Sequence, residues 1–430
     1  MHPRALGSLE HAMTLTNRAF GLVAVGVLRL RQAPPPAVLQ RALQQVQARH
    51  PLLQVRIVPT KKTYRFERLS PLPTIPLKVL ERRDDHHALA QAQQMLNEPL
   101  APTEGPLMRC VYLVAPDQRA DLICAFHHAI MDAPSAAHCY HELLTLCARS
   151  AAEHGLAEDD ALPQTIQPAA EALLPPAFTG FAQVRRLVPF LFREMRTDRH
   201  YRRRTTAAQR PSLHPPSTSH ILSESLSASQ TQALVRQSRQ ESVTLHSTLA
   251  AAMLSAVVRQ RYPADLPLAR MLIFSNLRPY LKPPVAPEYL GCYIAMQRLT
   301  IPFAPTSTLW TLARSLQESL HAANKRGEKY LSAVMSKHIM QQALRTQNDR
   351  MATAALSYVG PVKLQPTYGS IEVTDVHGFI TPNRLSPEWS AFGHLFRGQL
   401  HLDFMYMRND MDAAAAQSLV HALLELLRNP

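Results

Sequence analysis

The stretch FHHAIMDAPS at Phe126–Ser135 brings together residue types that can move protons. His127 and His128 follow a run of strand-forming residues, and Asp132 comes four residues after the second histidine. Neighbouring side chains on a strand point to opposite faces, so one imidazole can face a cleft while the other packs behind it. An imidazole with a pKa of about 6.5 can accept and return a proton near neutral pH. General acid–base catalysis is therefore one function that this segment can serve.

The same residues also suit structural functions. Asp132 stands where a carboxylate caps a helix by accepting bonds from its free N–H groups, and Pro134 is tolerated in a first turn. The chain contains 20 histidines, so neighbouring pairs such as His86–His87 also arise as ordinary structural residues. The spacing alone does not choose between catalysis and structure.

A metal site is a third interpretation of the segment. His128 and Asp132 are four residues apart and could bind one ion from a single helix, with His138 and His141 as further ligands. Pro134 and the strand pattern that precedes the histidines argue against a continuous helix through the pair. We therefore expect no metal ion here.

The composition describes an ordinary folded protein that is long enough for two domains. The chain has 430 residues, of which 46% are hydrophobic and 18% are charged. Its 13 glycines offer few phosphate-cradling loops, and neither GxGxxG nor GxxxxGK[ST] occurs. The serine hydrolase motif GxSxG is also missing. The sequence thus disfavours nucleotide-binding enzymes and hydrolases of that type.

The cysteines and the apolar runs favour a cytoplasmic protein. The five cysteines are odd in number and form no CxxC pair, which predicts reduced thiols and neither a disulfide framework nor a zinc site. No apolar run reaches the roughly 18 residues of a transmembrane helix.

The charge favours acidic partners. Lys and Arg number 46 against 32 Asp and Glu, which gives a net charge of +14. Nucleic acid, an anionic membrane, an acidic carrier protein and a phosphate-bearing cofactor all match such an excess, as does a generally basic surface without a partner. No helix-turn-helix or RNA-binding signature stands out, so we expect no nucleic-acid partner.

Helix and strand patterns alternate in both halves, which predicts an α/β fold. The predicted helices cover residues 34–49, 84–97, 132–148 and 244–261, with two more starting at 227 and 412. The predicted strands cover residues 53–57, 64–66, 107–114, 121–126, 221–226, 271–274 and 400–406. We expect one domain at 1–150, a Pro- and Arg-rich linker at 151–216 and a second domain at 217–430.

The predicted linker contains a basic amphipathic segment. Eight arginines fall between Arg185 and Arg204, with aromatic and aliphatic residues among them. Such a segment can lie on a membrane surface or bind an acidic partner, and Arg185, Arg186 and Arg193 are candidates for docking a carrier protein. The alternative is a short connecting helix that is packed by its apolar residues and keeps its arginines in water.

Several blocks resemble one enzyme superfamily. FHHAIMDAPS resembles the HHxxxDG motif of the chloramphenicol acetyltransferase-like superfamily, which includes the condensation domains of nonribosomal peptide synthetases, wax ester synthases and polyketide-associated acyltransferases. The last two are the nearer comparison, because no DFGWG block appears. Similar blocks occur at Arg49–Leu53 (RHPLL), Val243–Leu254 (VTLHSTLAAAML), Ser275–Leu281 (SNLRPYL), Leu290–Tyr293 (LGCY) and Ser357–Val362 (SYVGPV).

The resemblance implies a pseudo-dimer of two α/β domains with a central tunnel. In it His128, beside His127, is the general base that takes a proton from an alcohol as the alcohol attacks a thioester. The donor is acyl-coenzyme A or a phosphopantetheinyl thioester on an acyl carrier protein. No permanently bound cofactor and no metal are implied.

The resemblance gives Asp132 a structural role through an arginine salt bridge. Arg278 is the candidate partner and Asn276 a support of its loop; the alternative for Arg278 is a solvated turn arginine. Ala133 replaces the motif glycine, so the loop must be helix-like after Asp132. An amide-forming condensation enzyme and an inactive scaffold that binds a carrier protein are the alternatives to ester formation.

Overall fold

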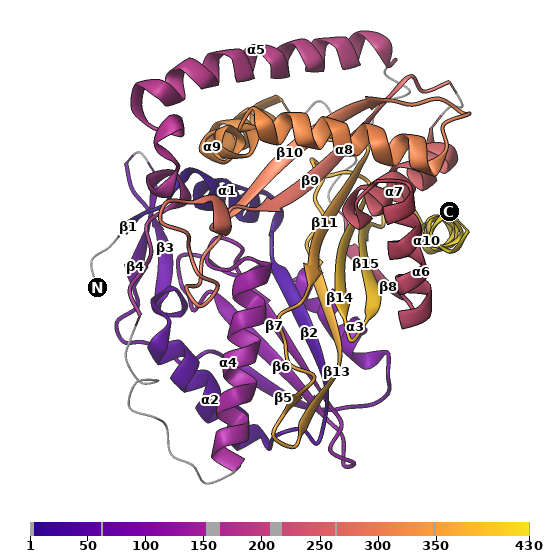
Figure 1. The fold of residues 1–430 in the computed structure, drawn as a ribbon. Coiled ribbons are helices and arrows are strands. Elements are labelled where there is room, and N and C mark those ends of the chain that lie inside the picture. Colours follow the sequence, from indigo (N-terminus) through magenta and orange to yellow (C-terminus); the bar gives the residue numbers. More distant parts are fainter. Residues whose placement is uncertain are drawn as a thin grey trace. The chain divides into compact units, whose positions relative to one another are not determined.

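The chain builds two six-stranded sheets, one in each of two units (Figure 1). The computed structural model describes residues 4–61, 63–151, 164–206, 217–262, 265–346 and 350–429. Unit 1 comprises residues 1–173, 283–293 and 361–381, and unit 2 comprises residues 174–282, 294–360 and 382–430. Both sheets contain parallel and antiparallel pairs, and helices accompany each of them. The predicted α/β fold in two halves is confirmed, while the central tunnel stays a prediction.

Unit 1 carries the segment with the paired histidines. Its large sheet has the strand order β12-β13-β2-β7-β6-β5, and a small sheet has the order β1-β4-β3. The strands are β1 (Arg4–Ala5), β2 (Ala24–Arg31), β3 (Val55–Pro59), β4 (Tyr64–Arg68), β5 (Leu77–Glu81), β6 (Met108–Val114), β7 (Ala120–Phe126), β12 (Thr367–Tyr368) and β13 (Ile371–Ile380). The helices are α1 (Ser8–Phe20), α2 (Pro36–Arg49), α3 (His87–Leu96) and α4 (Ala133–Ala151).

Strand β7, an inner strand of the large sheet, ends directly before the paired histidines. It pairs antiparallel with β2 on one side and β6 on the other, and all seven of its residues are buried. Its one charged residue, Asp121, lies 2.8 Å from the Arg82 guanidinium, so the buried charge is compensated. The strand ends at Phe126, so the paired histidines follow directly where the sheet stops.

Helices α2 and α4 pack together in unit 1. The apolar face predicted for α2 from Leu39, Leu43 and Val46 is buried, as the helical spacing requires. A Cβ atom on Gly26 of β2 would lie 2.5 Å from the hydroxyl oxygen of Tyr140 on α4. Only glycine therefore lets α4 approach the sheet this closely.

The unit boundaries differ from the domains expected from the sequence. Residues 283–293 and 361–381 belong to unit 1, although they fall in the predicted second domain. For residues 361–381 the reason is strand pairing, since β13 runs antiparallel to β2 with Gly378 opposite Gly26. Residues 283–293 are joined to unit 1 by bonds such as that from the N–H of Tyr293 to the Asp132 carboxylate. Local patterns identify a strand such as β13 but not its partner about 350 residues away in the chain.

Unit 2 has the strand order β10-β9-β11-β14-β15-β8. The strands are β8 (Ser219–Leu226), β9 (Leu268–Asn276), β10 (Ile294–Pro302), β11 (Ala354–Pro361), β14 (Trp389–Phe396) and β15 (Gln399–Met407). The helices are α5 (Gly180–Arg204), α6 (Ala228–Gln240), α7 (Leu245–Arg261), α8 (Leu309–Lys325), α9 (Glu328–Thr346) and α10 (Ala413–Arg428). The core joins α7, α8 and α10 to the sheet, with the rings of Trp389 and Phe404 stacked at 4.7 Å.

The predicted linker contains a long helix of unit 2. Helix α5 has 25 residues, with Pro189 inside it, and is much longer than the short helix expected. The alternative in which its apolar residues pack inward is wrong for most of them. Phe181, Val188 and Phe192 are exposed, whereas the buried residues of the helix are Phe190 and Tyr201. Two further parts of the predicted linker, residues 152–163 and 207–216, lie outside the described residues.

No single helix in the described ranges is long and apolar enough to cross a membrane. Helices α6 and α7 are long and apolar enough only when they are taken together, and this pair is bent by 99°.

Candidate active site

His128 presents an imidazole whose protonation is fixed by its neighbours. Its Nδ1 lies 2.9 Å from the carbonyl oxygen of Met131, and since a carbonyl can only accept, Nδ1 carries the proton. Nε2 then holds the free lone pair, and among the described residues it has no hydrogen-bond partner. Burial lowers the pKa of His128, against opposing contributions from the bond to Met131 and the charge of Asp132. The ring is therefore neutral at neutral pH, with Nε2 able to accept a proton.

His127 faces the interior of unit 1. Its side chain is fully buried, its backbone N–H donates to the Leu107 carbonyl oxygen, and its Nδ1 accepts from the N–H of Ala129 at 3.2 Å. Burial lowers the pKa of His127 to about 3, so this ring also stays neutral. The alternation of a strand does not apply to the two rings, because β7 ends at Phe126, before both histidines. The position of His127 suits support of the loop and not contact with a substrate.

Asp132 holds the loop to the start of α4. One carboxylate oxygen accepts from the backbone N–H of Ser135 at 3.0 Å and lies 2.7 Å from its hydroxyl oxygen. The other accepts from the N–H of Tyr293 at 3.0 Å. The helix-capping function predicted for Asp132 is confirmed. Its side chain is 1% exposed, so these bonds satisfy a buried charge.

Residues 291–293 complete this site within unit 1. The Gly291 carbonyl oxygen accepts from the N–H of Asp132 at 3.0 Å and lies 3.1 Å from the Ser135 hydroxyl oxygen. The Cys292 sulfur lies 3.9 Å from Nδ1 of His128. The sequence marked this block as LGCY but gave no sign of its contact with Asp132. A contact across about 160 residues leaves no trace in local spacing.

Gly291→Ala should destabilise unit 1. A Cβ atom there would lie 2.5 Å from the ring of Tyr293, whose hydroxyl donates to the Pro168 carbonyl oxygen at 2.9 Å. Moving the ring costs about 1–3 kcal/mol of unfolding free energy, as overpacking does elsewhere. Denaturant unfolding of the variant measures the loss.

The matched control for Gly291→Ala is the same change with Tyr293→Ala. Without the ring, the added methyl group should cost much less than in the wild-type background. An equal loss in both backgrounds would show that the ring contact is not the cause.

Ala133 replaces the motif glycine without strain. It is the first residue of α4, and it is not among the described residues with positive φ. The helix-like conformation expected after Asp132 is confirmed. The loop therefore needs no glycine at this position.

Arg278 and Asn276 lie in unit 2. Arg278 is buried in a short 3-10 turn (Arg278–Tyr280), and its backbone N–H donates to the Asn276 side-chain oxygen at 3.0 Å. The solvated alternative for Arg278 is wrong, because only 2% of the residue is exposed. Asn276 thus contacts this turn, while its support of the Asp132 motif stays a prediction. The salt bridge with Asp132 stays a prediction.

The three arginines proposed for carrier docking lie on α5 in different settings. Arg185 is exposed. The Arg186 guanidinium lies 4.9 Å from the ring centroid of Phe178, and Arg193 pairs with Glu328 at 2.5 Å. Arg193 is thus already engaged within unit 2, whereas Arg185 and Arg186 are both exposed.

One cluster in unit 1 has the residue types of a metal site. Donor atoms of His50, His138 and Glu142 lie within 4.8 Å of one another. The Glu142 carboxylate is already shared, since His50 Nε2 lies 2.5 Å and the Arg49 guanidinium 3.4 Å from its oxygens. A guanidinium on the same carboxylate opposes a cation, so the cluster fits an ion-pair network that joins the end of α2 to α4.

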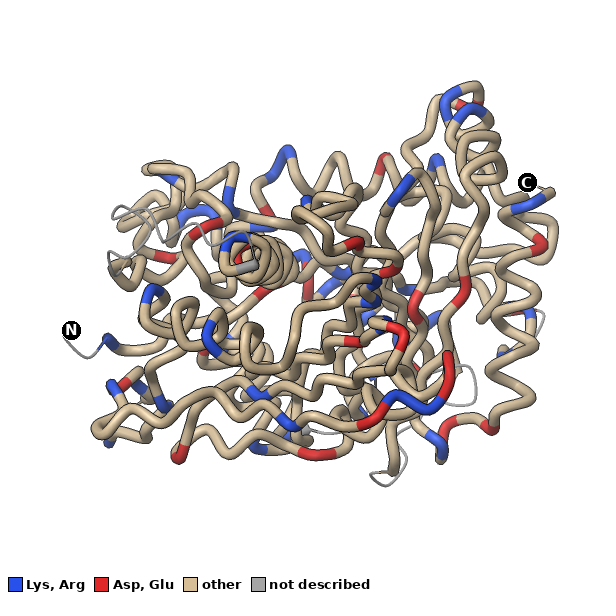
Figure 2. The backbone as a smooth tube through the Cα atoms, turned by 90° about the horizontal axis from the view of Figure 1, so that it is seen from below, with Lys and Arg blue, Asp and Glu red and all other residues tan. Residues whose placement is uncertain are grey.

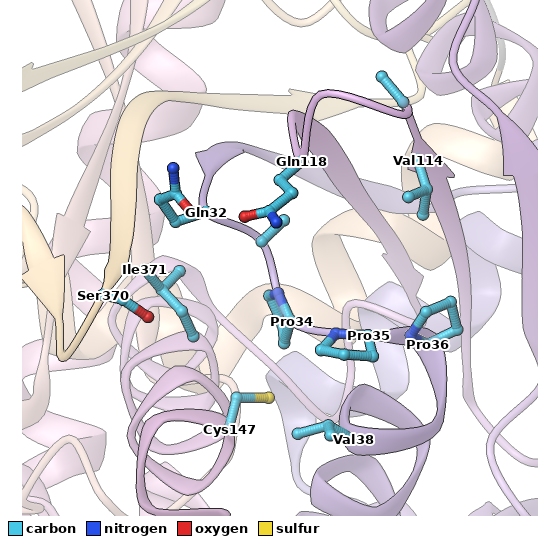
Figure 3. A pocket seen from close by; sticks show the side chains of 12 residues that line it. Gln32, Pro34, Pro35, Pro36, Val38, Val114, Gln118, Cys147, Ser370 and Ile371 are labelled. Atoms are coloured by element: carbon cyan, nitrogen blue, oxygen red, sulfur yellow. The ribbon is translucent and has the colours of Figure 1, made fainter. Parts of the chain in front are cut away.

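A pocket of about 330 Å³ lies at the other end of β7 (Figure 3). It is lined by Pro34, Pro35, Gln118, Cys147 and Ile371, among others. Strand β7 separates it from the histidines by seven residues, or roughly 23 Å of chain. Burial raises the pKa of Cys147 to about 12, so this thiol is not a nucleophile at neutral pH. The pocket is therefore not the site that His128 serves.

The positive charge is distributed along the chain. Figure 2 shows Lys and Arg along the whole chain, mixed with fewer Asp and Glu.

Two family profiles match the chain. One, described as "Condensation domain", matches residues 22–161 and includes the paired histidines. The other, described as "Phthiocerol/phthiodiolone dimycocerosyl transferase C-terminus", matches residues 215–405. Together they span about three quarters of the chain. No curated protein matches the sequence.

Solved structures share the fold over nearly the full length. Polyketide synthase associated protein 5 from Mycobacterium tuberculosis is 18% identical, with a TM-score of 0.70 over 99% of this chain and 98% of that one. Trichothecene 15-O-acetyltransferase from Fusarium sporotrichioides is 11% identical, with a TM-score of 0.78 over 99% and 94%. The first condensation domain of the calcium-dependent antibiotic synthetase is 14% identical, with a TM-score of 0.74 over 100% and 97%.

Identities this low establish the fold and leave the reaction open. The family assignment therefore rests on the two profiles, which match consecutive parts of the chain. Residues 22–161 thus match the condensation-domain family and residues 215–405 the phthiocerol/phthiodiolone dimycocerosyl transferase C-terminal family, which confirms the resemblance to the condensation-domain and polyketide-associated acyltransferase superfamily.

Proposed function

We propose that the protein transfers an acyl group from a thioester to an alcohol, with His128 as the general base. The observation that carries this proposal is the bond from Nδ1 of His128 to the Met131 carbonyl oxygen, which leaves the lone pair on Nε2. The match to the dimycocerosyl transferase profile supports an ester as the product. The donor is acyl-coenzyme A or an acyl carrier protein, since both are acidic and suit a chain of charge +14.

In this reaction Nε2 of His128 takes the proton from the alcohol as its oxygen attacks the thioester carbonyl carbon. The C–O bond forms, the C–S bond breaks, and the thiolate takes the proton back from Nε2. The products are an ester and a free thiol. Between the two transfers the ring is an imidazolium, which the Met131 carbonyl oxygen and the charge of Asp132 both stabilise. The thioester supplies the driving force, so the steps require neither a metal nor a covalent enzyme intermediate.

Amide formation is the second candidate. The match of residues 22–161 to the condensation domain favours it, because such domains carry the same motif. An amine can give its proton to Nε2 just as an alcohol does, so the base alone does not separate the two reactions. The inactive scaffold is a third candidate, in which the chain only binds a carrier protein.

A product screen tests the three candidates. The purified protein is incubated with acyl-coenzyme A or acyl carrier protein and with panels of alcohols and amines, and products are identified by mass spectrometry. Ester products would support the proposal. Amides alone would replace it with the second candidate. If the protein binds a carrier protein but gives no product with any donor and acceptor, the inactive scaffold remains as the function.

The pH profile should report a histidine of lowered pKa. Burial lowers the pKa of His128, so the base remains unprotonated at pH values where a free imidazole is already charged. We expect kcat/KM to stay level as the pH falls to about 6.5, the ordinary histidine value, and to decrease only below it. An acid limb centred above that value would contradict His128 as the base. Circular dichroism at each pH serves as the control for unfolding.

A further inference from the structure

Helix α5 concentrates the exposed apolar surface of the protein. Ten large apolar side chains are exposed among the described residues, and six of them lie on this one helix. They are Phe181, Val184, Val188, Leu191, Phe192 and Met195, with exposed fractions from 36% to 78%. Single exposed apolar residues are ordinary, but a contiguous group marks an interaction surface.

The six residues form one stripe along the outer side of α5. Five of them follow spacings of three, four, three and four residues from Phe181 to Met195, which places them on one helical face. That face extends for about 21 Å at 1.5 Å per residue. Phe190 and Tyr201, which are buried, lie on the opposite face. Figure 1 shows α5 as a long helix beside α9, with which it packs.

The inner side of α5 is fixed to unit 2 by its acidic residues. Glu194 pairs with Arg298 at 2.9 Å, and Asp198 pairs with Arg270 at 2.7 Å. The Arg270 guanidinium also lies 3.9 Å from the ring centroid of Tyr201. Both acidic groups of the helix are thus engaged with β9 and β10, and the apolar stripe is held outward.

The outer side of α5 is strongly basic. The helix has eight arginines and two acidic residues. Arg185, Arg196 and Arg199 are exposed, and their helical positions lie beside or at the end of the apolar stripe. The surface therefore offers apolar and cationic groups together, with its acidic groups turned away.

We propose that α5 binds the surface of an anionic lipid membrane, with the apolar stripe in the headgroup–acyl boundary and the arginines on lipid phosphates. A helix with an apolar face and arginines around it, lying in the plane of the interface, is the geometry of interfacial helices. An anionic bilayer satisfies both the apolar and the cationic groups at once. The proposal does not depend on the proposed acyl transfer.

The charge of α5 disfavours a second copy of the chain as the occupant. Pairing two such stripes would bring two arginine-rich helices together, and like charges at close range repel. An acidic carrier protein would match the arginines of α5. Its charge would not cover the apolar stripe, which is about 21 Å long.

Vesicle flotation tests the proposal with the full chain. We expect binding to vesicles of phosphatidylcholine with phosphatidylglycerol, weaker binding to phosphatidylcholine alone, and weakening of the former by salt. The double change Phe181→Gln with Phe192→Gln should reduce binding to the anionic vesicles by at least about tenfold. Arg185→Gln with Arg196→Gln should reduce binding to the anionic vesicles only.

Matched controls separate α5 from the rest of the surface. Leu72→Gln with Val79→Gln removes two exposed apolar residues of unit 1, and Arg236→Gln with Arg239→Gln removes two exposed charges from α6. Neither pair should change vesicle binding. The proposal would be overturned by no vesicle binding, by equal binding of the phenylalanine variant, or by a solution dimer or carrier complex that this variant abolishes while vesicle binding persists.

Discussion

His128→Ala should lower kcat by about 10²–10⁴-fold, the range that a positioned general base contributes. The change removes the lone pair that Nε2 holds because Nδ1 donates to the Met131 carbonyl oxygen. The protein should stay folded, because the variant loses one hydrogen bond and one half-buried ring. Turnover and thermal unfolding are measured on the same preparation.

The control for this prediction is His86→Ala. His86 is exposed on the surface of unit 1, and its hydrogen bonds are made by its backbone, whose N–H donates to Asp84 and whose carbonyl oxygen accepts from the N–H of Ala90. The change His86→Ala should therefore leave turnover and melting temperature unchanged. A His128 variant that keeps turnover within tenfold of wild type would remove this residue as the base, and a collapsed melting curve would make its lost activity a folding effect.

Asp132→Ala should lower both stability and rate. The change leaves the buried backbone N–H groups of Ser135 and Tyr293 without an acceptor, at roughly 1–3 kcal/mol each. The bond to Ser135 is also the cap of helix α4, so the start of this helix is weakened as well. A loss of about 3 kcal/mol lowers the melting temperature of a unit of this size by roughly 6–12 °C. The rate should fall as well, because the Met131 carbonyl oxygen that orients His128 immediately precedes Asp132 in the same loop.

Two comparisons sharpen the Asp132 prediction. Asp117→Ala removes an exposed carboxylate that bonds only Arg119, and it should change stability little. A double-mutant cycle of Asp132→Ala with Arg278→Ala measures the salt bridge implied by the family, since coupled residues are not additive. A melting curve unchanged by Asp132→Ala would contradict the structural role.

The sequence predicted those features that depend on local spacing. The buried face of α2 follows from apolar residues three and four positions apart, and Pro51 ends that helix where expected. The cap at Asp132 follows from its position before Ala133. In each case the interaction joins residues within one or two turns, so the pattern contains all the information needed.

The features that depend on distant contacts were not predictable from the sequence. Nothing near Asp132 indicates that the backbone of Tyr293 bonds its carboxylate. The side of α5 that faces water was also not predictable. The sequence shows an amphipathic pattern, but ion pairs such as that of Asp198 with Arg270 decide which side faces unit 2. A periodic pattern defines a face and does not say what covers it.

The position of β13 in the large sheet of unit 1 has a consequence for biosynthesis. Until Ile380 has left the ribosome, β2 has a neighbour on only one side, and its unpaired backbone groups are a template for association with other chains. A nascent chain that stops after α4 therefore exposes the unpaired edge of an incomplete sheet. Cells that make this protein must protect that edge during the synthesis of more than two hundred further residues.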